Sequence, residues 1–267
     1  MITKVCLLRI LECMTIQYAS DLHLEFPENS EYLLRNPILP VADILILAGD
    51  IGYLDHYTYS DHPFWDWASE NFKQVLITLG NHEFYSGYDV EIIESGAVGE
   101  IRSNIHWYYN KSVVIRDVEF IMTPLWSYIP PGADYIVESK ISDFKCIRYH
   151  NKKLKAHDFN KLHSDSLAFL KNSLIPKRAT KVVCVTHHLP SIACIAKQFK
   201  GDILSSAFVS EQYNLIEESS VDYWIYGHSH RNIEEITIGK TKLVSNQLGN
   251  VNFNEHLNFN NCAKFGL

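Results

Sequence analysis

Residues 42–50 read ADILILAGD, a short run of large aliphatic side chains that stops abruptly at a glycine and a carboxylate. An unbroken apolar run of this length is typical of a β-strand buried on both faces, as in the sheets of α/β proteins. Four further runs end in polar residues in the same way: TIQYAS before Asp21 and His23, KQVLITLG before Asn81 and His82, TKVVCVT before His187 and His188, and VDYWIYG before His228 and His230. The sequence therefore predicts an α/β fold with five buried strands.

The polar residues that follow these runs are expected to meet in space. In α/β sheets, ligands gather in the crevice beyond the carboxyl ends of the strands. A lone Asp-x-His pair or a single histidine carries little weight, because such matches arise often by chance. Five strand endings of this kind, in order along one chain, are much harder to dismiss. The tight turn YGHSHRN, residues 226–232, is then better explained as part of a metal site than as polar loop filler.

The donor atoms of this set suit two adjacent divalent ions. Seven nitrogen or oxygen donors without a cysteine exceed one tetrahedral site, and imidazole with carboxylate favours Mn, Fe, Zn or Ni over Ca or Mg. Two ions about 4 Å apart can share a carboxylate and clamp the attacking and leaving oxygens of a phosphoryl group. The expected ligands are Asp21, His23, Asp50, Asn81, His187, His228 and His230.

Composition limits the classes of protein and partner. The chain has 267 residues, 46% of them hydrophobic, and a net charge of −7. We expect a single domain over residues 14–267, because no linker or repeat divides the chain. The acidic charge disfavours a long nucleic-acid groove without excluding nucleic acid, and bound metal can supply positive charge for a small phosphorylated substrate. The sequence does not indicate an oligomeric state.

The cysteines and the first residues bear on location. None of the six cysteines forms a C-x-x-C pair, which indicates a reduced, cytoplasmic setting. The apolar stretch within residues 1–13 is interrupted by Arg9 and is too short for secretion or a membrane span. We expect residues 1–13 to be an extension outside the fold.

Between the strands, local signals predict helices and one hairpin. Pro63, after Ser60 and Asp61, marks a helix start. Residues 157–174 carry apolar side chains at helical spacing, and EEITIGKTKLVSN predicts a hairpin around Gly239 and Lys240.

The five blocks in order, D-L-H, G-D, G-N-H-E, T-H-H and G-H-S-H, resemble the calcineurin-like metallophosphoesterases, and the segment that follows Thr123 resembles that of small bacterial and phage-borne members. The resemblance runs from about residue 14 to about residue 250. It implies a four-layer αββα sandwich of two mixed sheets flanked by helices, with a dinuclear metal site at the carboxyl-terminal edge of the strands. It assigns Asp21, His23, Asp50 and His230 to one metal and Asp50, Asn81, His187 and His228 to the other. Gly227 would let the backbone pass close by.

The resemblance also assigns a role to His82, as the acid that protonates the leaving oxygen. Phosphoprotein phosphatases of the family hold this histidine with an Asp three residues after the bridging Asp, and they carry substrate-binding arginines. This chain has Tyr53, Leu54 and Leu79 at those positions, which disfavours a phosphoprotein phosphatase. Glu83 is a possible substitute for the missing Asp. His188 could orient a ligand, contact a lid or be purely structural.

Residues 124–150 resemble the inserted, cap-like segment of the small members, including the pieces PLWS and ISDFKCIR. Such inserts overhang the metal site, so side chains on or near them are candidate substrate contacts, although a packed cap is the alternative. The candidates are Trp126, Tyr128, Arg148, Lys200 and, beside His230, Arg231.

The resulting hypothesis is a metal-dependent phosphoesterase that hydrolyses a small or nucleotide-like phosphomonoester or phosphodiester through a metal-bridging hydroxide. One alternative is a nuclease of the same superfamily. The other is a catalytically silent relative that serves as a protein-binding scaffold, since fold does not fix function.

Overall fold

Two six-stranded sheets form the centre of the molecule in the computed structural model, which describes residues 14–175 and 179–267. The expected extension, residues 1–13, lies outside the described residues. In the first sheet, β1, β2, β3 and β5 are parallel, and β14 and β4 are antiparallel strands at its two edges. Its strand order is β14 (Lys264–Gly266), β1 (Thr15–Ala19), β2 (Ile44–Ala48), β3 (Gln74–Thr78), β5 (Ile105–Tyr108) and β4 (Val98–Arg102).

The second sheet repeats this plan. Its four central strands are parallel, and an antiparallel strand closes each edge. The strand order is β12 (Ile236–Ile238), β13 (Thr241–Ser245), β11 (Tyr223–Tyr226), β10 (Lys181–Thr186), β7 (Val118–Thr123) and β6 (Lys111–Ile115). Both sheets are therefore mixed, as the family resemblance implies.

The alternation of side chains along each strand explains how the sheets stack. In β2, Ile44, Ile46 and Ala48 pack against the second sheet, in a core with Phe120 and Val183. The side chains between them point the other way, because successive residues of a strand face opposite sides of the sheet. Every residue of β2 is buried on one face or the other.

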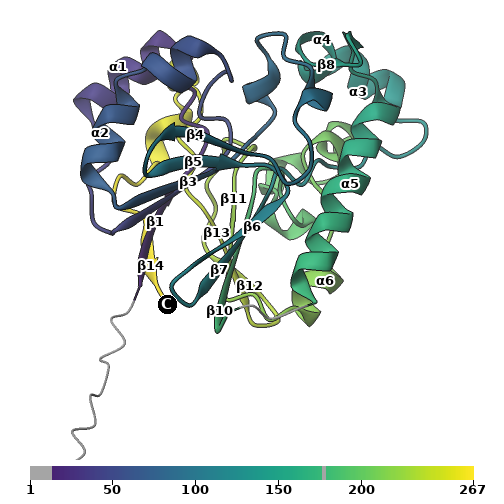
Figure 1. The fold of residues 1–267 in the computed structure, drawn as a ribbon. Helices are drawn as coiled ribbons and strands as arrows, with labels where there is room; N and C mark the ends of the chain where they lie inside the picture. Colours follow the sequence, from purple (N-terminus) through teal and green to yellow (C-terminus); the bar gives the residue numbers. More distant parts are fainter. Residues whose placement is uncertain (1–13, 176–178) are drawn as a thin grey trace, which may run out of the picture.

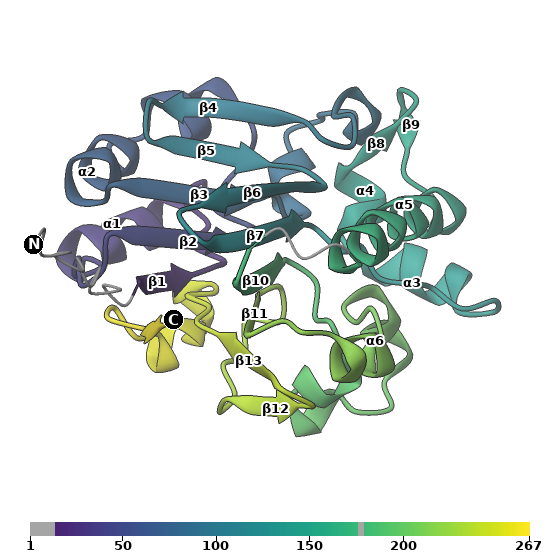
Figure 2. The ribbon, with the colours of Figure 1, turned by 60° about the horizontal axis from the view of Figure 1, so that its bottom comes forward.

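Helices cover the outer face of each sheet and complete four layers (Figure 1, Figure 2). On the first sheet, α1 (Pro27–Arg35) and α2 (Phe64–Asn71) bury Leu33 and Trp65 against Leu47. On the second sheet, α5 (Ala156–Leu174) and α6 (Tyr213–Glu218) bury Leu170 and Ile216. The predicted four-layer αββα sandwich is confirmed.

Shorter elements connect these layers. Helices α3 (Asp134–Lys140) and α4 (Asp143–Cys146) and the two-stranded sheet β8 (Arg148–Tyr149) and β9 (Lys152–Lys153) lie near one another at the upper right of Figure 1. The remaining helical turns are η1 (Tyr57–Asp61), η2 (His82–Phe84), η3 (Val90–Ile92), η4 (Ile192–Cys194), η5 (Lys197–Phe199), η6 (Ile203–Ala207), η7 (Val251–Phe253) and η8 (Glu255–Asn258).

The local predictions agree with this architecture. All five predicted strands are present, α2 begins directly after Pro63, α5 matches the predicted helix, and β12 and β13 form the predicted hairpin. The strands between residues 98 and 123 were not predicted, although β7 is a central strand of the second sheet. Among the described residues, no helix combines the length and the apolar character needed to cross a membrane.

The core between the sheets generates a stability prediction. Phe120 is fully buried there, whereas Phe253 is 74% exposed. Phe120→Ala should lower the free energy of unfolding by about 3–5 kcal/mol, because it removes buried apolar surface and leaves a cavity. The control Phe253→Ala should change it by less than about 0.5 kcal/mol. Urea titrations followed by circular dichroism measure both, and equal losses would contradict the assignment of the core.

Candidate metal centre

The candidate site lies where the parallel strands of both sheets end. Asp21 and His23 follow β1, Asp50 follows β2, and Asn81 follows β3, all in the first sheet. The second sheet contributes three histidines, one after β10 and two after β11: His187, His228 and His230. The structure brings all seven residues together in two adjoining groups, which share Asp50.

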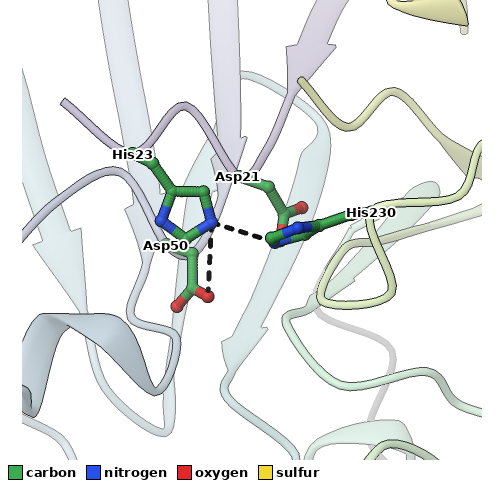
Figure 3. Close-up of side chains that lie close together, drawn as sticks. All are labelled: Asp21, His23, Asp50 and His230. Atoms are coloured by element: carbon green, nitrogen blue, oxygen red, sulfur yellow. Dashed lines mark hydrogen bonds and ion pairs between the residues drawn. The ribbon is translucent and has the colours of Figure 1, made fainter. Parts of the chain in front are cut away.

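The first group consists of Asp21, His23, Asp50 and His230, and its donor atoms lie within 4.8 Å of one another (Figure 3). The Nε2 atom of His23 is 2.9 Å from Nε2 of His230 and 3.9 Å from Oδ2 of Asp50. The Nε2 atom of His230 is 3.4 Å from Oδ1 of Asp21. Two carboxylates and two imidazoles with atoms this close could hold one metal ion.

The second group consists of Asp50, His187 and His228, with Asn81 beside them. The Nε2 atom of His187 is 3.3 Å from Oδ1 of Asp50, 3.1 Å from Nδ1 of His228 and 2.9 Å from Oδ1 of Asn81. The two oxygens of Asp50 thus face different groups. This arrangement could hold a second ion, with Asp50 between the two.

The histidines of both groups use their remaining ring nitrogen elsewhere. The Nδ1 atom of His23 lies 2.9 Å from Glu25, Nδ1 of His230 lies 2.7 Å from Glu255, and Nδ1 of His187 lies 2.9 Å from the carbonyl oxygen of Ala48. The Nε2 atom of His228 lies 3.4 Å from the carbonyl oxygen of Ala207. An acceptor at the outer nitrogen fixes the tautomer and the ring orientation of a metal-binding histidine.

Charge reinforces this arrangement. Burial opposes ionisation of Asp50, but His187 and His82 outweigh it and hold the pKa of the Asp50 carboxyl well below its usual value. Burial likewise opposes ionisation of Glu25 and Glu255, yet hydrogen bonds from the neighbouring histidines lower both pKa values to about 2. These three carboxylates are therefore ionised at neutral pH, and ionisation of a carboxylate such as Asp50 is a requirement for metal binding.

The backbone at the site is strained. Five of the seven expected ligands have a positive φ angle between 48° and 76°, in the left-handed region that non-glycine residues rarely adopt. Such outliers cluster at functional sites, where the surrounding structure holds them in place. These residues are Asp21, His23, Asp50, His228 and His230.

Gly227 permits the close approach of the two sheets. A Cβ atom on Gly227 would lie 2.6 Å from Oδ2 of Asp21 and 2.8 Å from Oγ of Ser20. Beside it, the backbone amide of His228 donates to Oδ1 of Asp21 at 2.9 Å. The predicted role of Gly227, to let the turn pass close to its neighbours, fits this geometry.

Glu83 has a different position from the one suggested by the sequence. Its carboxylate accepts hydrogen bonds from the backbone amides of Asp50, Ile51 and Gly80 and from the hydroxyl of Tyr59. Burial and the charge of Asp50 raise the pKa of Glu83 to about 7. The idea that Glu83 holds His82 is wrong, because Glu83 supports the turns after β2 and β3.

Glu25 occupies the position next to His82 instead. Its Oε1 atom lies 2.9 Å from Nδ1 of His82. Sequence reasoning overlooked this residue, although Glu25 is two positions after His23 in the run D-L-H-L-E. It also overlooked Asp143, whose Oδ1 accepts from Nδ2 of Asn81 at 2.9 Å and from the hydroxyl of Tyr85 at 2.5 Å. No spacing signal connects Asp143 with Asn81.

A pocket of about 430 Å³ opens beside the two groups. Asp50, Asn81, His82, His228 and His230 line one side of it. The other walls come from the end of α3, from the segment that joins α3 to α4, and from residues 195–208 around η5 and η6. They carry apolar side chains together with Lys140, and Arg231 lines the pocket beside His230.

The candidate substrate contacts differ in their positions. Arg231 lines the pocket and donates to Glu255 at 3.0 Å. Trp126 is fully buried in the core and donates to the hydroxyl of Tyr109, so the expectation that it touches a substrate does not fit its position. Tyr128, Arg148 and Lys200 are exposed and are not among the residues that line this pocket.

His188 is buried behind the second group. Its ring centroid lies 4.2 Å from that of His228, and Nδ1 lies 3.2 Å from the carbonyl oxygen of Pro124. Burial, followed by the charge of His187, holds the pKa of His188 well below its usual value. Of the alternatives for His188, a neutral packing partner of His228 fits this position best.

The chain is similar to known proteins in sequence and in structure. The chain is 26% identical over 274 residues to an uncharacterised protein of Acanthamoeba polyphaga mimivirus, a match that covers 93% of this chain and 95% of that protein. The crystal structure of phosphopantetheinyl hydrolase from Mycobacterium tuberculosis aligns with a TM-score of 0.63 at 15% identity, covering 89% of this chain and 90% of that one. A dimetal phosphatase from Danio rerio aligns with a TM-score of 0.49 at 14% identity, covering 88% and 87% of the two chains.

The family assignment comes from the sequence match. The family model described as calcineurin-like phosphoesterase matches residues 14–232, which include every strand ending described above. At 15% identity, the likeness to the hydrolase from Mycobacterium tuberculosis is evidence for a shared fold alone. Because the family model covers most of the 267 residues, the chain belongs to the calcineurin-like phosphoesterase family.

Proposed function

We propose that this phosphoesterase uses two divalent metal ions to hydrolyse a small or nucleotide-like phosphomonoester or phosphodiester. The observation that carries the proposal is the orientation of the four clustered histidines. Each directs one ring nitrogen into the cluster and has an acceptor at the other nitrogen. Histidines held in this way are oriented for metal binding, because a proton on the outer nitrogen leaves a lone pair on the inner nitrogen.

The donor set supports the proposed ligand assignment. Asp21, His23, Asp50 and His230 would hold one ion, and Asp50, Asn81, His187 and His228 the other. Nitrogen and oxygen donors without sulfur favour Mn, Fe, Zn or Ni. When bound, such ions supply a Lewis acid for the phosphoryl oxygens and an activated water that attacks phosphorus.

The chain's own residues would bind the substrate and protonate its leaving group. Arg231 lines the pocket beside the first group and can contact a phosphoryl oxygen. His82 lines the same pocket, and its Nδ1 atom is hydrogen-bonded to Glu25. As the bond between phosphorus and the ester oxygen breaks, its electron pair stays on that oxygen, and the doubly protonated ring of His82 donates its Nε2 proton to it. One water is consumed, and an alcohol leaves.

The size and lining of the pocket support a small substrate. A volume of about 430 Å³ suits a small molecule, and the apolar wall formed by Ile141, Phe199, Leu204 and Phe208 suits an organic group attached to the phosphate. The cytoplasmic location expected from the cysteines stays a prediction.

Dependence on metal is the first test. Metal-free protein should be inactive, and adding Mn, Ni, Zn, Fe or Mg in turn should restore activity with at least one ion. The substrates are nitrophenyl phosphate, its diester, nucleotides, cyclic nucleotides, a phosphopantetheinyl compound, and single- and double-stranded oligonucleotides. Hydrolysis with no divalent ion present would contradict the proposal, and preferential cleavage of the oligonucleotides would favour the nuclease alternative.

Replacement of the shared carboxylate is the second test. Asp50→Asn should remove bound metal and lower kcat/KM by at least about 1,000-fold, because metal-assisted charge stabilisation is worth several kcal/mol. Metal content is measured by mass spectrometry alongside the rate. The matched control is Asp165→Asn on α5, whose side chain is 52% exposed and paired with Lys161. Full metal content and activity in Asp50→Asn would contradict the assignment.

The acid role of His82 makes a separate prediction. His82→Ala should lower kcat about 10²- to 10⁴-fold for an alkyl ester, whose alkoxide is a poor leaving group and needs a proton. The loss should be much smaller for a nitrophenyl ester, because nitrophenolate leaves without protonation. Steady-state rates on both esters measure the difference. Equal losses would leave His82 as a phosphate contact only.

A further inference from the structure

Glu25 links the ring of His82 to the metal cluster by a hydrogen bond, in addition to the bond from the backbone amide of His82 to Oδ1 of Asp50 at 2.8 Å. The Oε1 atom of Glu25 lies 2.9 Å from Nδ1 of His23 and 2.9 Å from Nδ1 of His82, so one oxygen accepts from two rings. The side chain of Glu25 is 3% exposed, and His23 is completely buried. The ring centroids of the two histidines are 4.4 Å apart and their planes are inclined at 73°. A movement of this carboxylate would therefore shift both rings.

The contact fixes which nitrogen of each ring points away from Glu25. With Nδ1–H donated to Glu25, the neutral ring of His23 keeps a lone pair on Nε2 for metal, whereas His82 must carry a second proton, on Nε2, to act as an acid. The Nε2 atom of His23 faces Asp50 and His230 in the first group. His82 lines the pocket, where its Nε2 atom serves the leaving oxygen in the proposed reaction.

Few other contacts orient the ring of His82. Tyr85 stacks on it at a centroid distance of 4.0 Å, and the ring of Tyr53 lies 6.5 Å away. Stacking limits tilting but does not fix which ring nitrogen faces the pocket. Within residues 14–175 and 179–267, the bond to Glu25 is the one hydrogen bond that the His82 ring makes. Glu25 is therefore the group on which its orientation depends.

We propose that Glu25 is a shared positioning residue that couples metal binding to leaving-group protonation, because the same carboxylate oxygen orients the proposed ligand His23 and the proposed acid His82. This inference rests on the proposed function. It predicts that replacing Glu25 affects both metal affinity and protonation of the leaving group, whereas a residue that orients only a metal ligand would affect metal affinity alone.

Glu255 provides the matched control, since its Oε2 atom lies 2.7 Å from Nδ1 of His230 and it makes no contact with His82 among the described residues. Glu255→Ala should weaken metal binding about 10- to 100-fold. At saturating Mn²⁺ it should slow alkyl and nitrophenyl esters by similar factors. Glu25→Ala should weaken Mn²⁺ binding to a similar extent.

The distinguishing readout is the dependence on the leaving group. At saturating Mn²⁺, Glu25→Ala should retain a loss in kcat of about 10- to 100-fold for the alkyl ester and of less than about 3-fold for the nitrophenyl ester. Glu25→Gln keeps an acceptor oxygen and should recover part of both effects. The double variant Glu25→Ala/His82→Ala should hydrolyse the alkyl ester no more slowly than His82→Ala, because the two residues act as one unit.

Three results would overturn the inference. Equal losses for both esters in Glu25→Ala would mean that Glu25 orients only the metal ligand. Unchanged Mn²⁺ affinity in Glu25→Ala would mean that Glu25 does not couple metal binding to protonation. Additive losses in the double variant would mean that Glu25 and His82 act independently. Melting curves check that the variants fold. If Glu25→Ala does not fold, the same measurements are made on Glu25→Gln. Failure of the proposed function is distinguishable, because it would appear in the wild type as hydrolysis without metal, or in His82→Ala as equal losses for both esters.

Discussion

The site depends on the junction between the two sheets at the carboxyl ends of their strands. Each group of donors takes residues from both sheets, so neither sheet alone contains a complete group. The junction is made by short polar contacts: the amide of His228 donates to Asp21, and the carbonyl oxygen of Ala48 lies 2.9 Å from Nδ1 of His187. The apolar core beneath, which includes Phe120, keeps the sheets at the spacing that these contacts need.

Strain and support are balanced at this junction. A left-handed conformation at a non-glycine residue costs on the order of 1–3 kcal/mol, and five of the expected ligands adopt it. Neighbouring side chains offset part of that cost by binding the backbone of the turns. Glu83 accepts from the amides of Asp50 and Gly80, and Gln247 accepts from the amide of His230 at 2.7 Å. These hydrogen bonds hold the turns that carry the expected ligands in position.

The sequence predicted those parts that have a local signal. Buried runs such as ADILILAGD revealed five strands and the residues at their ends, because apolar pattern and chain position need no tertiary knowledge. The residues around those ends were harder to find. Glu25 carries a weak signal in its spacing from His23, but Asp143 and Glu255 approach the cluster from distant segments. Glu83 was predicted to contact His82, which was wrong, because adjacency in the sequence does not reveal the direction in which a side chain points.

The chain order of the site also bears on its synthesis. The residues of the first group span positions 21 to 230, and β1 pairs with β14 near residue 265. A growing polypeptide on the ribosome therefore cannot assemble the cluster until β11 and its turn have emerged. Until then, the apolar face of the first sheet is not fully covered by the second. The first group is therefore complete only once residue 230 has been translated, which makes its assembly a late event in folding.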